Sequence, residues 1–540
     1  MITRIFRASN SIASAAVVLG LAGLFSRLLG VYRDRLLATT FGAGATLDVY
    51  YAAFRIPDFI FNLLVLGALS AGFIPVFSEY LNKSKEEAWR LAQAVLFVLF
   101  FVLIAVCALL FIFAPWLMQF LTPGFDQENI TMTVGLTRIM LLSPILLGVS
   151  SVFGGILQSL KRFLAYSLAP IFYNLGIIFG IVVFVRFYGI DGLAWGVVMG
   201  SFLHLLMQLL VSYKLGWRWI NLKFWQENGL VEVIRLMGPR TLALAITQIN
   251  LVVITIIASG LQEGRLAIFT LAQNLAHVPI GLFGISFAVA AFPVLSSQYA
   301  EKKELAFSQT IYKTLTQILF FLFPSLVVFA LLDEQIVRLV LGAGEFDWAS
   351  TLLTARTLLY FIPGILAQAL LPLFARAFYA QKNTRHPLYA AGVGLVLNAI
   401  LGIWLAGLFG VIGLAMAFSL ASLVQVILLM IWQFSKIPKT DVPNALSSTS
   451  FMFVASMAML IAMQLVKHFS GPFLNLLTVK GVLVHFLLPM LVGGSVYFLV
   501  LKMFKAPEYL YFEEVFLNKI KSFRRVFLPV EGVGAEDDLL

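Results

Sequence analysis

Long stretches of uninterrupted apolar residues alternate with short polar connections along almost the whole chain. A helix needs about 20 apolar residues to cross roughly 30 Å of hydrocarbon, and about fourteen stretches are that long. They begin near Ser11, Ala45, Arg90, Thr131, Leu164, Gly192, Val231, Leu266, Thr310, Ser350, Leu388, Gly410, Ser450 and Val482. No stretch alternates apolar and polar positions, so strands are excluded as spanning elements. The pattern predicts an all-α integral membrane protein with about fourteen transmembrane helices.

Short motifs recur in the two halves of the chain at one offset of about 220 positions. Gly189–Ala194 and Gly410–Ala415 share the pattern Gly-x-x-Gly-Leu-Ala. The other pairs are Pro75–Ser78 with Pro293–Ser296, Gly124–Asp126 with Glu345–Asp347, and Gln158, Arg162 and Asn174 with Gln381, Arg385 and Asn398. Several matches in the same order indicate two copies of one unit, which is typical of proteins that move a substrate across a membrane.

Each copy holds about six spans, and this even number gives both copies the same orientation in the membrane. We therefore predict two parallel six-helix repeats around a central cavity, an N-lobe at 1–230 and a C-lobe at 231–440. Two further helices occupy 441–505, outside the repeat. In the tail, 506–540, aromatic residues recur at helical spacing with basic residues between them. This spacing predicts a cytoplasmic amphipathic helix followed by a flexible end.

The charge distribution predicts the orientation. Of the 540 residues, 61% are hydrophobic and 12% are charged, against about 25% in soluble proteins. The basic loop residues are Lys83, Lys85, Arg90, Lys161, Arg162, Lys214, Arg218, Lys223, Lys302, Lys303, Lys382, Arg385, Lys436 and Lys439, and the acidic residues of the opposite loops are Asp126, Glu128, Asp191, Glu263, Asp333, Glu334, Glu345 and Asp347. The positive-inside rule then places both termini in the cytoplasm. The net charge of +11 reflects this topology and contact with anionic membrane lipids, and it does not indicate nucleic-acid binding.

Few residues suggest chemistry other than binding. The single cysteine, Cys107, lies in an apolar run, and the five histidines are scattered without the spacing of metal ligands. An enzyme acting on polyprenyl-linked sugars would need paired acids or an Asp cluster for a metal, commonly in long polar loops, and the loops here are short. We expect no metal site, no catalytic residue and no cofactor.

Ionisable residues inside predicted spans are the informative ones, because an Arg at a helix centre costs about 2.5–3.5 kcal/mol on insertion scales. The densest group comprises Arg27, Arg33, Asp34, Arg35, Asp48, Arg55 and Asp58, at the ends of the first and second spans. Seven residues are close to two helical turns, so Arg27 and Asp34 share a face, as do Asp48, Arg55 and Asn62.

These two polar faces have two interpretations. They form a cationic patch for an anionic group, since guanidinium matches phosphate in geometry and charge. Alternatively, Arg27 and Asp34 form an internal ion pair while Arg33 and Arg35 extend to the outer interface.

The second repeat carries a weaker polar signal. Gln273, Asn274 and His277 lie within about a turn of one another, before Pro279. They either line a cavity or form helix–helix hydrogen bonds, as amides and histidines commonly do in membranes. Arg376, deep in the tenth apolar run, is a further cavity candidate because a charge there must face protein or water.

The segment Phe25–Asp34, followed by Phe41–Gly44, Asp48, Gly67-Ala68, Ala71–Pro75 and Glu79-Tyr80, resembles the opening of the MurJ/MviN family. Later matches are Leu236–Pro239, Pro279-x-Gly281-x-x-Gly284, Phe378–Ala380 and Thr384–Pro387, so the resemblance covers about residues 10–435. The family comprises lipid II flippases of the multidrug/oligosaccharidyl-lipid/polysaccharide exporter superfamily.

This resemblance implies a two-lobed flippase that moves an undecaprenyl-pyrophosphate-linked sugar-peptide from the inner to the outer leaflet. It also implies that the last two helices form a groove for the lipid tail. The family's motif arginines correspond to Arg27 and Arg33, its acid to Asp48 and its basic residue before the Pro to Arg55. This chain departs from the family at Asn62, where an Arg is usual, at Leu66, and at Gln273-Asn274, where the family has an Asp-Arg pair.

We therefore predict a lipid II flippase for cell wall biogenesis, which works by alternating access in the bacterial plasma membrane. Arg27, Arg33 and Arg55 would bind the pyrophosphate, and Asp34 or Asp48 would orient them or form gate ion pairs. Asn62, Asn274 and Arg376 complete the predicted substrate-binding set. The membrane potential supplies about 2.3 kcal/mol per charge per 100 mV to reset a cationic cavity. We expect a monomer, with cell-wall synthesis proteins as candidate partners.

Three alternatives stay open at this point. The first is an exporter of another polyprenyl-linked oligosaccharide or of a small cation, although a cation exporter would want acidic cavity residues. The second is a membrane enzyme, which the short loops disfavour. The third is a flippase-derived scaffold that no longer transports, which the two missing cavity arginines favour.

Overall fold

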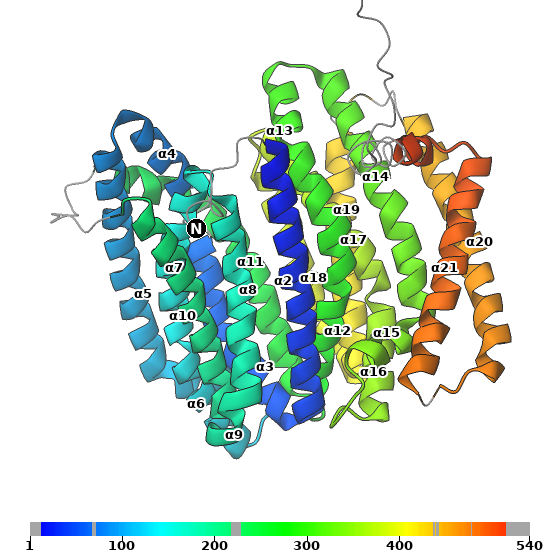
Figure 1. The fold of residues 1–540 in the computed structure, drawn as a ribbon, viewed down its shortest axis with the longest axis horizontal. Coiled ribbons are helices and arrows are strands. Elements are labelled where there is room, and N and C mark those ends of the chain that lie inside the picture. Colours follow the sequence, from blue (N-terminus) through cyan, green and yellow to red (C-terminus); the bar gives the residue numbers. More distant parts are fainter. Residues whose placement is uncertain are drawn as a thin grey trace, which may run out of the picture. The chain divides into compact units, whose positions relative to one another are not determined.

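The structure, a computed structural model, describes residues 12–66, 72–217, 228–435, 438, 442–476 and 478–514. Within these ranges the chain is helical and contains no strand (Figure 1). The α-helices are α2 Ile12–Phe41, α3 Ala45–Ile60, α4 Ile74–Lys83, α5 Lys85–Leu121, α6 Gln127–Met140, α7 Leu142–Ser159, α8 Phe163–Phe179, α9 Val185–Tyr188, α10 Asp191–Lys214, α11 Asn228–Ser259, α12 Arg265–Pro279, α13 Ser286–Ala300, α14 Glu304–Leu331, α15 Asp333–Val340, α16 Trp348–Tyr360, α17 Ile362–Ala380, α18 Arg385–Phe409, α19 Val411–Phe434, α20 Val442–Ser470 and α21 Val479–Met503. The predicted all-α fold is confirmed.

The chain is a multi-pass membrane protein. Eleven helical segments of the described ranges are long and apolar enough to cross a membrane. The helices α2, α3 and α11 occupy the remaining positions where the apolar runs predict a span. Each predicted start lies close to the first residue of one of these helices, because continuous apolar sequence that must cross a bilayer can satisfy its backbone only as helix.

In the part of the chain that the structure describes, three spans contain a π-helical segment. In the second span, α3 carries Pro57 and is followed by π turns at Phe61–Leu66. In the eighth, α12 ends at Pro279 and is followed by π turns at Ile280–Ile285. A third π segment, Gly180–Phe184, joins α8 to α9. Proline removes one backbone donor and π turns accommodate an extra residue, so the side-chain register changes at these points.

Local backbone geometry repeats at the offset of about 220 positions that the motifs show. Asp126 caps α6 by accepting a 2.8 Å hydrogen bond from the N–H of Asn129, and Asp347 caps α16 in the same way from Ser350. In each case a second helix follows after one residue, α7 after α6 and α17 after α16. The same offset relates left-handed residues, Lys161 with Lys382, both at φ 57°, and Gly189 with Gly410, at φ 58° and 60°.

A buried asparagine makes an equivalent bridge in each copy. The Asn174 Nδ2 on α8 donates to the carbonyl of Ser26 on α2, at 3.3 Å. The Asn398 Nδ2 on α18 donates to Oδ1 of Asn250 on α11, at 2.7 Å. In both copies the fifth span is thereby tied to the first, which supports the internal repeat.

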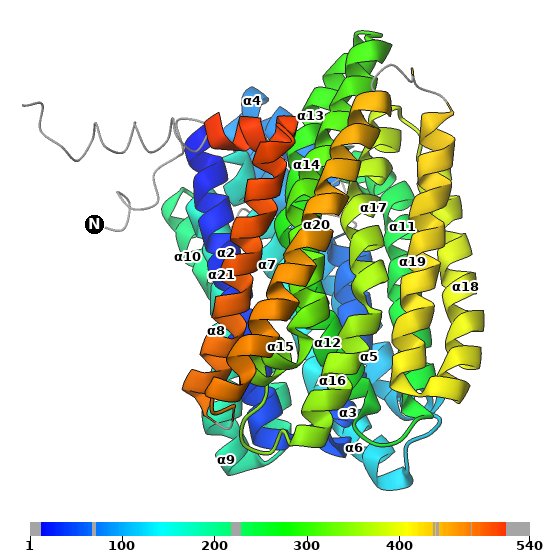
Figure 2. The ribbon, with the colours of Figure 1, turned by 90° about the vertical axis from the view of Figure 1, so that its right-hand side faces the viewer.

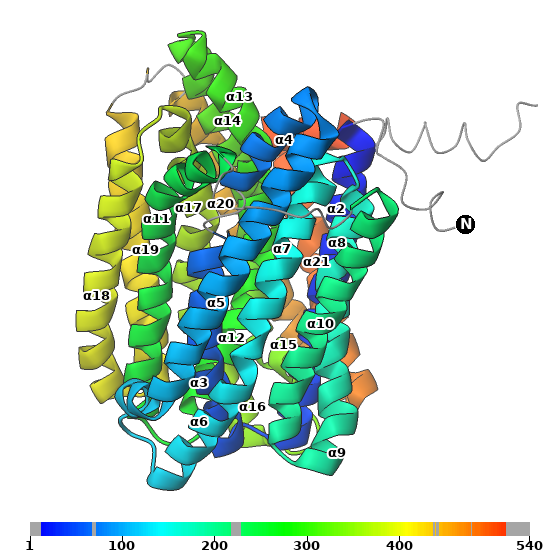
Figure 3. The same ribbon diagram turned by 90° about the vertical axis from the view of Figure 1, so that its left-hand side faces the viewer.

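The chain divides into two compact units. The first comprises Met1–Val278, Ile336–Gln368 and Thr384–Leu429, and the second comprises Pro279–Gln335, Ala369–Asn383 and Met430–Leu540. These boundaries differ from the lobe boundaries expected from the repeat, and the lobes stay a prediction. In the first unit, α5, α7 and α10 pack side by side (Figure 3). The ring of Trp217 meets Trp89 and Phe153 edge to face, with centroids 5.6 and 5.2 Å away.

In the second unit, α20 and α21 form a hairpin closed by the 3-10 turn Gly471–Phe473 (Figure 2). The Tyr497 hydroxyl on α21 donates a 2.8 Å hydrogen bond to the carbonyl of Phe320 on α14, which fixes the hairpin to that helix. After α21, residues 507–514 are again helical. The rest of the predicted amphipathic helix, with the apolar residues Phe516, Ile520 and Phe523, lies outside the described residues.

Candidate functional site

Arg33 and Asp34 of α2 form an ion pair inside the first compact unit. The Arg33 Nη2 lies 2.8 Å from Oδ1 of Asp34, and Nε donates to the same oxygen at 3.0 Å. The Arg33 Nη1 also donates to Oδ1 of Asn174, at 3.2 Å. Asp34 is therefore paired with its neighbour, and the predicted alternative of a pair with Arg27 is wrong. Helical spacing allowed that pair, but the Arg33 side chain is long enough to contact the carboxylate of the adjacent residue through two of its nitrogens.

Arg33 and Arg35 both contact protein groups. The side chain of Arg33 is only 23% exposed. Arg35 donates through Nη1 to the carbonyls of Leu339 and Val340, the last residues of α15. A cation is favoured there because the final carbonyls of a helix lack intrahelical donors. Arg35 therefore has a structural contact.

Asn274 joins α12 to this pair. Its Nδ2 donates to Oδ2 of Asp34 at 2.9 Å, so both oxygens of the carboxylate are used. Of the two interpretations of the polar face on α12, the helix–helix hydrogen bond applies to Asn274. Gln273 is buried, and His277 is exposed.

Asp48 caps a helix and makes no ion pair with another described residue. Its Oδ2 accepts from the N–H of Gly264 and its Oδ1 from the N–H of Ala267, each at 2.7 Å. Gly264 directly precedes α12 and Ala267 lies in its first turn, where free N–H groups and the helix dipole favour a carboxylate. Gly264 has φ +79°, and a Cβ there would collide with the carbonyl of Ala43. Asp48 thus holds the start of α12 against the start of α3.

Arg55 reaches from α3 to α11. Its Nε donates to the hydroxyl of Thr255 at 2.8 Å. Its Nη2 is buried and has no hydrogen-bond partner among the residues that the structure describes. A buried, charged donor without an acceptor is unfavourable, so an anionic ligand that reached this group would supply the acceptor it lacks.

Asn62 does not share the expected face with Asp48 and Arg55. It lies in the π segment Phe61–Leu66, and its Nδ2 donates to the carbonyl of Asp58 at 2.8 Å. The prediction assumed a regular helix through residue 62, whereas the α-helix ends at Ile60 and the register changes there. The face is correct only as far as Arg55.

Two tyrosines next to this group were not predicted. The rings of Tyr50 and Tyr51 lie 5.4 Å apart, and both side chains are buried. The Tyr51 hydroxyl has no hydrogen-bond partner in the described part of the chain, and Arg33, Asp34 and Arg55 all lie within electrostatic range of it. Because tyrosines in an apolar run count as apolar, a search for ionisable residues and amides passes over them.

Arg27 and Arg376 complete the predicted set. Arg27 is exposed on α2, with no hydrogen bond or ion pair to another described residue. Arg376 belongs to the second compact unit, where its Nη1 donates to the carbonyl of Pro372 at 3.3 Å. The structure does not place Arg376 with the other candidates, and it stays a predicted cavity residue.

The arrangement in the first unit suits anion binding. The charge of Arg33 is offset by Asp34, whereas neither Arg27 nor Arg55 makes an ion pair with a described residue, although Asp58 lies within electrostatic range of Arg55. Guanidinium groups bind phosphate oxygens strongly in such surroundings. Over the same ranges, no three His, Cys, Asp or Glu side chains gather where they could hold a metal ion.

Comparisons with known proteins agree on one family. Residues 37–508 match the family model described as lipid II flippase MurJ. A protein of Buchnera aphidicola subsp. Acyrthosiphon pisum, named probable lipid II flippase MurJ, is 30% identical over 418 residues, 76% of this chain and 82% of that protein. A Rhizobium tropici protein of the same name is 29% identical over 510 residues, 90% of this chain and 95% of its own length.

Solved structures agree with this match. A structure described as lipid II flippase MurJ in an inward closed conformation has a TM-score of 0.75 at 26% identity, covering 90% of this chain and 98% of that one. A multidrug transporter of the MATE family, in an inward-facing conformation, has a TM-score of 0.63 at 15% identity, covering 78% and 98%. The second likeness concerns the fold alone.

Proposed function

Because the chain belongs to the MurJ family of lipid II flippases, we propose that it carries lipid II from the inner to the outer leaflet of the bacterial plasma membrane. The match of residues 37–508 to the family model carries this proposal. The local chemistry supports it, since a lipid-linked pyrophosphate requires cations inside a membrane protein, and α2 and α3 supply them. The protein acts as a transporter in cell wall biogenesis and catalyses no covalent reaction.

Arg27 and Arg55 make the first contacts with the pyrophosphate, because neither is held in an ion pair by a described residue, and Asp58 lies within electrostatic range of Arg55 without forming one. Arg33 joins them by exchanging Asp34 for a phosphate oxygen. Asp34 also accepts from Asn274, so this exchange changes the contact between α2 and α12. A ligand that alters a helix–helix contact shifts the balance between two conformations, which alternating access requires.

One end of the first unit is closed by backbone contacts. The N–H of Glu345 donates to the carbonyl of Thr39 at 3.0 Å, and Gly264 packs on Ala43 beside the Asp48 cap. The loops at this end are acidic, and the positive-inside rule assigns them to the outside. We infer that the structure is of a state closed to the outside, in which lipid II enters from the cytoplasmic leaflet.

Both termini lie in the cytoplasm in this proposal, and the protein works as a monomer without a cofactor. The membrane potential returns the unloaded cationic site, at about 2.3 kcal/mol per charge per 100 mV. Proteins of cell wall synthesis are the candidate partners.

The proposal is tested by complementation of a bacterial strain depleted of its own lipid II flippase. We expect the wild-type chain to restore growth and lipid II exposure, and Arg55→Ala to fail at matched membrane expression. A wild-type chain that is inserted and still fails would favour the scaffold or another exporter.

A further inference from the structure

A cavity of about 900 Å³ is lined entirely by residues of the second compact unit. Its walls are α13, α14, α20 and the segment that follows α21. Cavities of roughly 300–1,000 Å³ are typical of ligand sites. None of the residues proposed to bind lipid II lines it.

The cavity is polar at one depth and aromatic at another. Gln309 and Lys313 line it near the start of α14, and Phe321 lines it about 12 Å further along that helix, at a rise of 1.5 Å per residue. On α20 the order is the same, with Asn444 before Phe451. A membrane lipid has this arrangement, with a polar headgroup at the interface and chains below it.

The segment after α21 folds over the cavity. Lys505 adopts φ 50°, a left-handed conformation that turns the chain back. The ring of Phe512 then lies 6.0 Å from that of Phe321 and stacks on Phe498 at 5.8 Å. The Nζ of Lys313 lies 5.3 Å from the centroid of the Tyr511 ring. Since the family match ends at residue 508, most of this cover lies beyond it.

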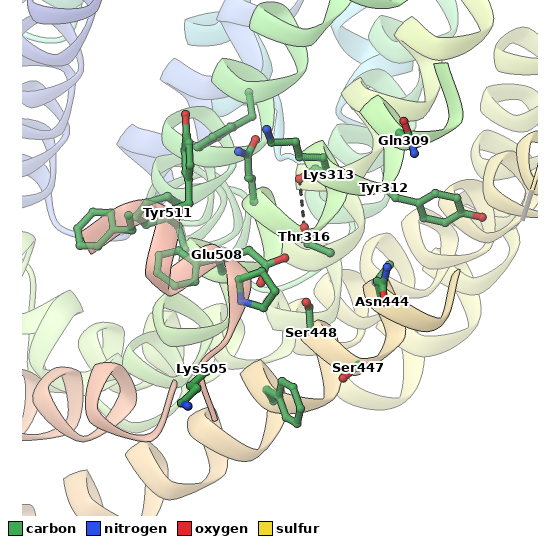
Figure 4. A pocket seen from close by; sticks show the side chains of 18 residues that line it. Gln309, Tyr312, Lys313, Thr316, Asn444, Ser447, Ser448, Lys505, Glu508 and Tyr511 are labelled. Atoms are coloured by element: carbon green, nitrogen blue, oxygen red, sulfur yellow. Dashed lines mark hydrogen bonds between the residues drawn. The ribbon is translucent and has the colours of Figure 1, made fainter. Parts of the chain in front are cut away.

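Opposite charges face the cavity without pairing. Lys313 comes from α14, Lys505 and Glu508 come from the covering segment, and no ion pair joins Glu508 to either lysine in the described part of the chain. The Glu508 Oε2 is buried and has no hydrogen-bond partner there. In Figure 4 its carboxylate points toward the side chains of Thr316 and Ser448. A buried carboxylate oxygen normally has a donor, so the ligand is expected to bring one.

We propose that this cavity binds a phospholipid whose headgroup carries both a phosphate and a protonated amine. The phosphate lies at Lys313 with the amides of Gln309 and Asn444, the ammonium donates to Glu508, and an acyl chain packs on Phe321. A headgroup without an amine leaves Glu508 unsatisfied beside a phosphate. A quaternary amine has no N–H to donate, so an ethanolamine-type headgroup is the best match.

The resemblance assigns the groove of the last two helices to the lipid tail of the substrate, and one of those helices, α20, is a wall of this cavity. The present proposal concerns a headgroup site at that wall and does not require lipid II. A polyprenyl pyrophosphate has no amine beside its phosphates, and it would not satisfy Glu508. The two lipids can therefore be distinguished by the same binding experiment.

The test uses the purified full-length chain and native mass spectrometry with phosphoethanolamine, phosphocholine and phosphoglycerol lipids of equal chains, and with undecaprenyl pyrophosphate. We expect the ethanolamine lipid to bind most tightly of the three phospholipids, and undecaprenyl pyrophosphate to bind elsewhere, with an affinity that changes at this cavity do not alter. Glu508→Gln should weaken that lipid alone by about tenfold, and Lys313→Gln should weaken all three phospholipids by a similar factor. Matched controls are Glu513→Gln, whose carboxylate pairs with Lys502 at 3.1 Å, and Lys303→Gln, which pairs with Glu301. Neither residue lines the cavity, and neither change should alter binding.

Equal affinity for ethanolamine and choline lipids, or an unchanged preference in Glu508→Gln, would overturn the proposal. Preferred binding of undecaprenyl pyrophosphate at this cavity would also contradict it. A measurement without variants uses the lipids that co-purify with the wild-type chain. They should be enriched in ethanolamine lipids relative to the membrane extract, and no enrichment would count against the site.

Discussion

At the scale of single residues, Arg33 and Asp34 form one nearly neutral group inside the membrane region. Removing one partner of a buried pair leaves the other charge uncompensated, which costs about 3–5 kcal/mol. We expect Arg33→Ala to lower thermal stability in detergent by about that free energy. The double variant Arg33→Ala, Asp34→Ala should recover most of the stability.

The double variant also separates structure from transport. If Arg33 binds pyrophosphate, the double variant is stable and does not expose lipid II. If Arg33 serves only Asp34, transport returns together with stability. A double variant as unstable as Arg33→Ala would show that the pair is not the reason for the loss.

Arg55 provides a second prediction at this scale. Its buried Nη2 and its planar guanidinium suit two parallel hydrogen bonds to phosphate, which an ammonium cannot make. We expect Arg55→Ala to abolish lipid II exposure and Arg55→Lys to reduce it by about tenfold or more. Arg138→Ala, on the exposed side of α6 against Phe111, is a matched control and should transport normally. Normal activity of Arg55→Lys would remove the bidentate contact from the mechanism.

The sequence predicted which residues of this group are chemically important, but not how they pair. Intramembrane charges stand out because insertion is costly. Whether Asp34 pairs with Arg27 or Arg33 depends on side-chain rotamers, and helical spacing does not determine these. The role of Asp48 depends on the N–H groups of Gly264 and Ala267, more than 200 positions away in sequence, and no local pattern indicates that contact.

At the scale of helices, Asp48 connects the starts of α3 and α12. Removing a helix cap costs about 0.5–2 kcal/mol. We expect Asp48→Ala to destabilise the protein by about that amount and to loosen the closed end of the first unit. A cysteine placed at Ala43, in a protein with Cys107 replaced by Ser, should then react faster with a membrane-impermeant maleimide.

Asp126→Ala is a suitable control for this prediction. Asp126 also caps a helix, but its donor, the N–H of Asn129, belongs to the helix that directly follows it, α6, so no second helix is held. Its loss should lower stability by a comparable amount without changing the reaction at position 43. Equal labelling in both variants would mean that Asp48 stabilises α12 without holding the end closed.

The existence of the helices was predictable, whereas their irregularities were not. Continuous apolar runs identify a span, because a bilayer requires a satisfied backbone. The π segments at Phe61–Leu66 and Ile280–Ile285 have the same apolar composition as the helices around them. The sequence therefore could not predict that Asn62 lies in a π segment, where the side-chain register differs from that of a regular helix.

At the scale of the whole molecule, we expect residues 506–514 to contribute to stability and residues 515–540 not to contribute. Phe512 packs on α14 and α21 through Phe321 and Phe498. We expect deletion of 515–540 to leave thermal stability unchanged, and deletion of 506–540 to lower it by about 1–3 kcal/mol through lost apolar burial. Both proteins should still insert into the membrane. Equal stability of the two truncated proteins would show that the packing of Phe512 on α14 and α21 does not stabilise the protein.

The repeat was predictable from matched motifs, and the two compact units were not. Motifs report which positions correspond, and the paired caps at Asp126 and Asp347 follow that correspondence closely. The units depend on which helices pack together, and apolar side chains on neighbouring spans carry little sequence information about their partners.

The bridges made by Asn174 and Asn398 have a consequence for how the protein is assembled. Each bridge joins two spans of the same copy, so each half of the chain contains both partners of its own bridge. A gene divided between codons 217 and 228 would therefore encode two polypeptides that each retain both partners of one bridge. Such halves, produced in one cell, are expected to reassociate into a working carrier, as two independently synthesised subunits would.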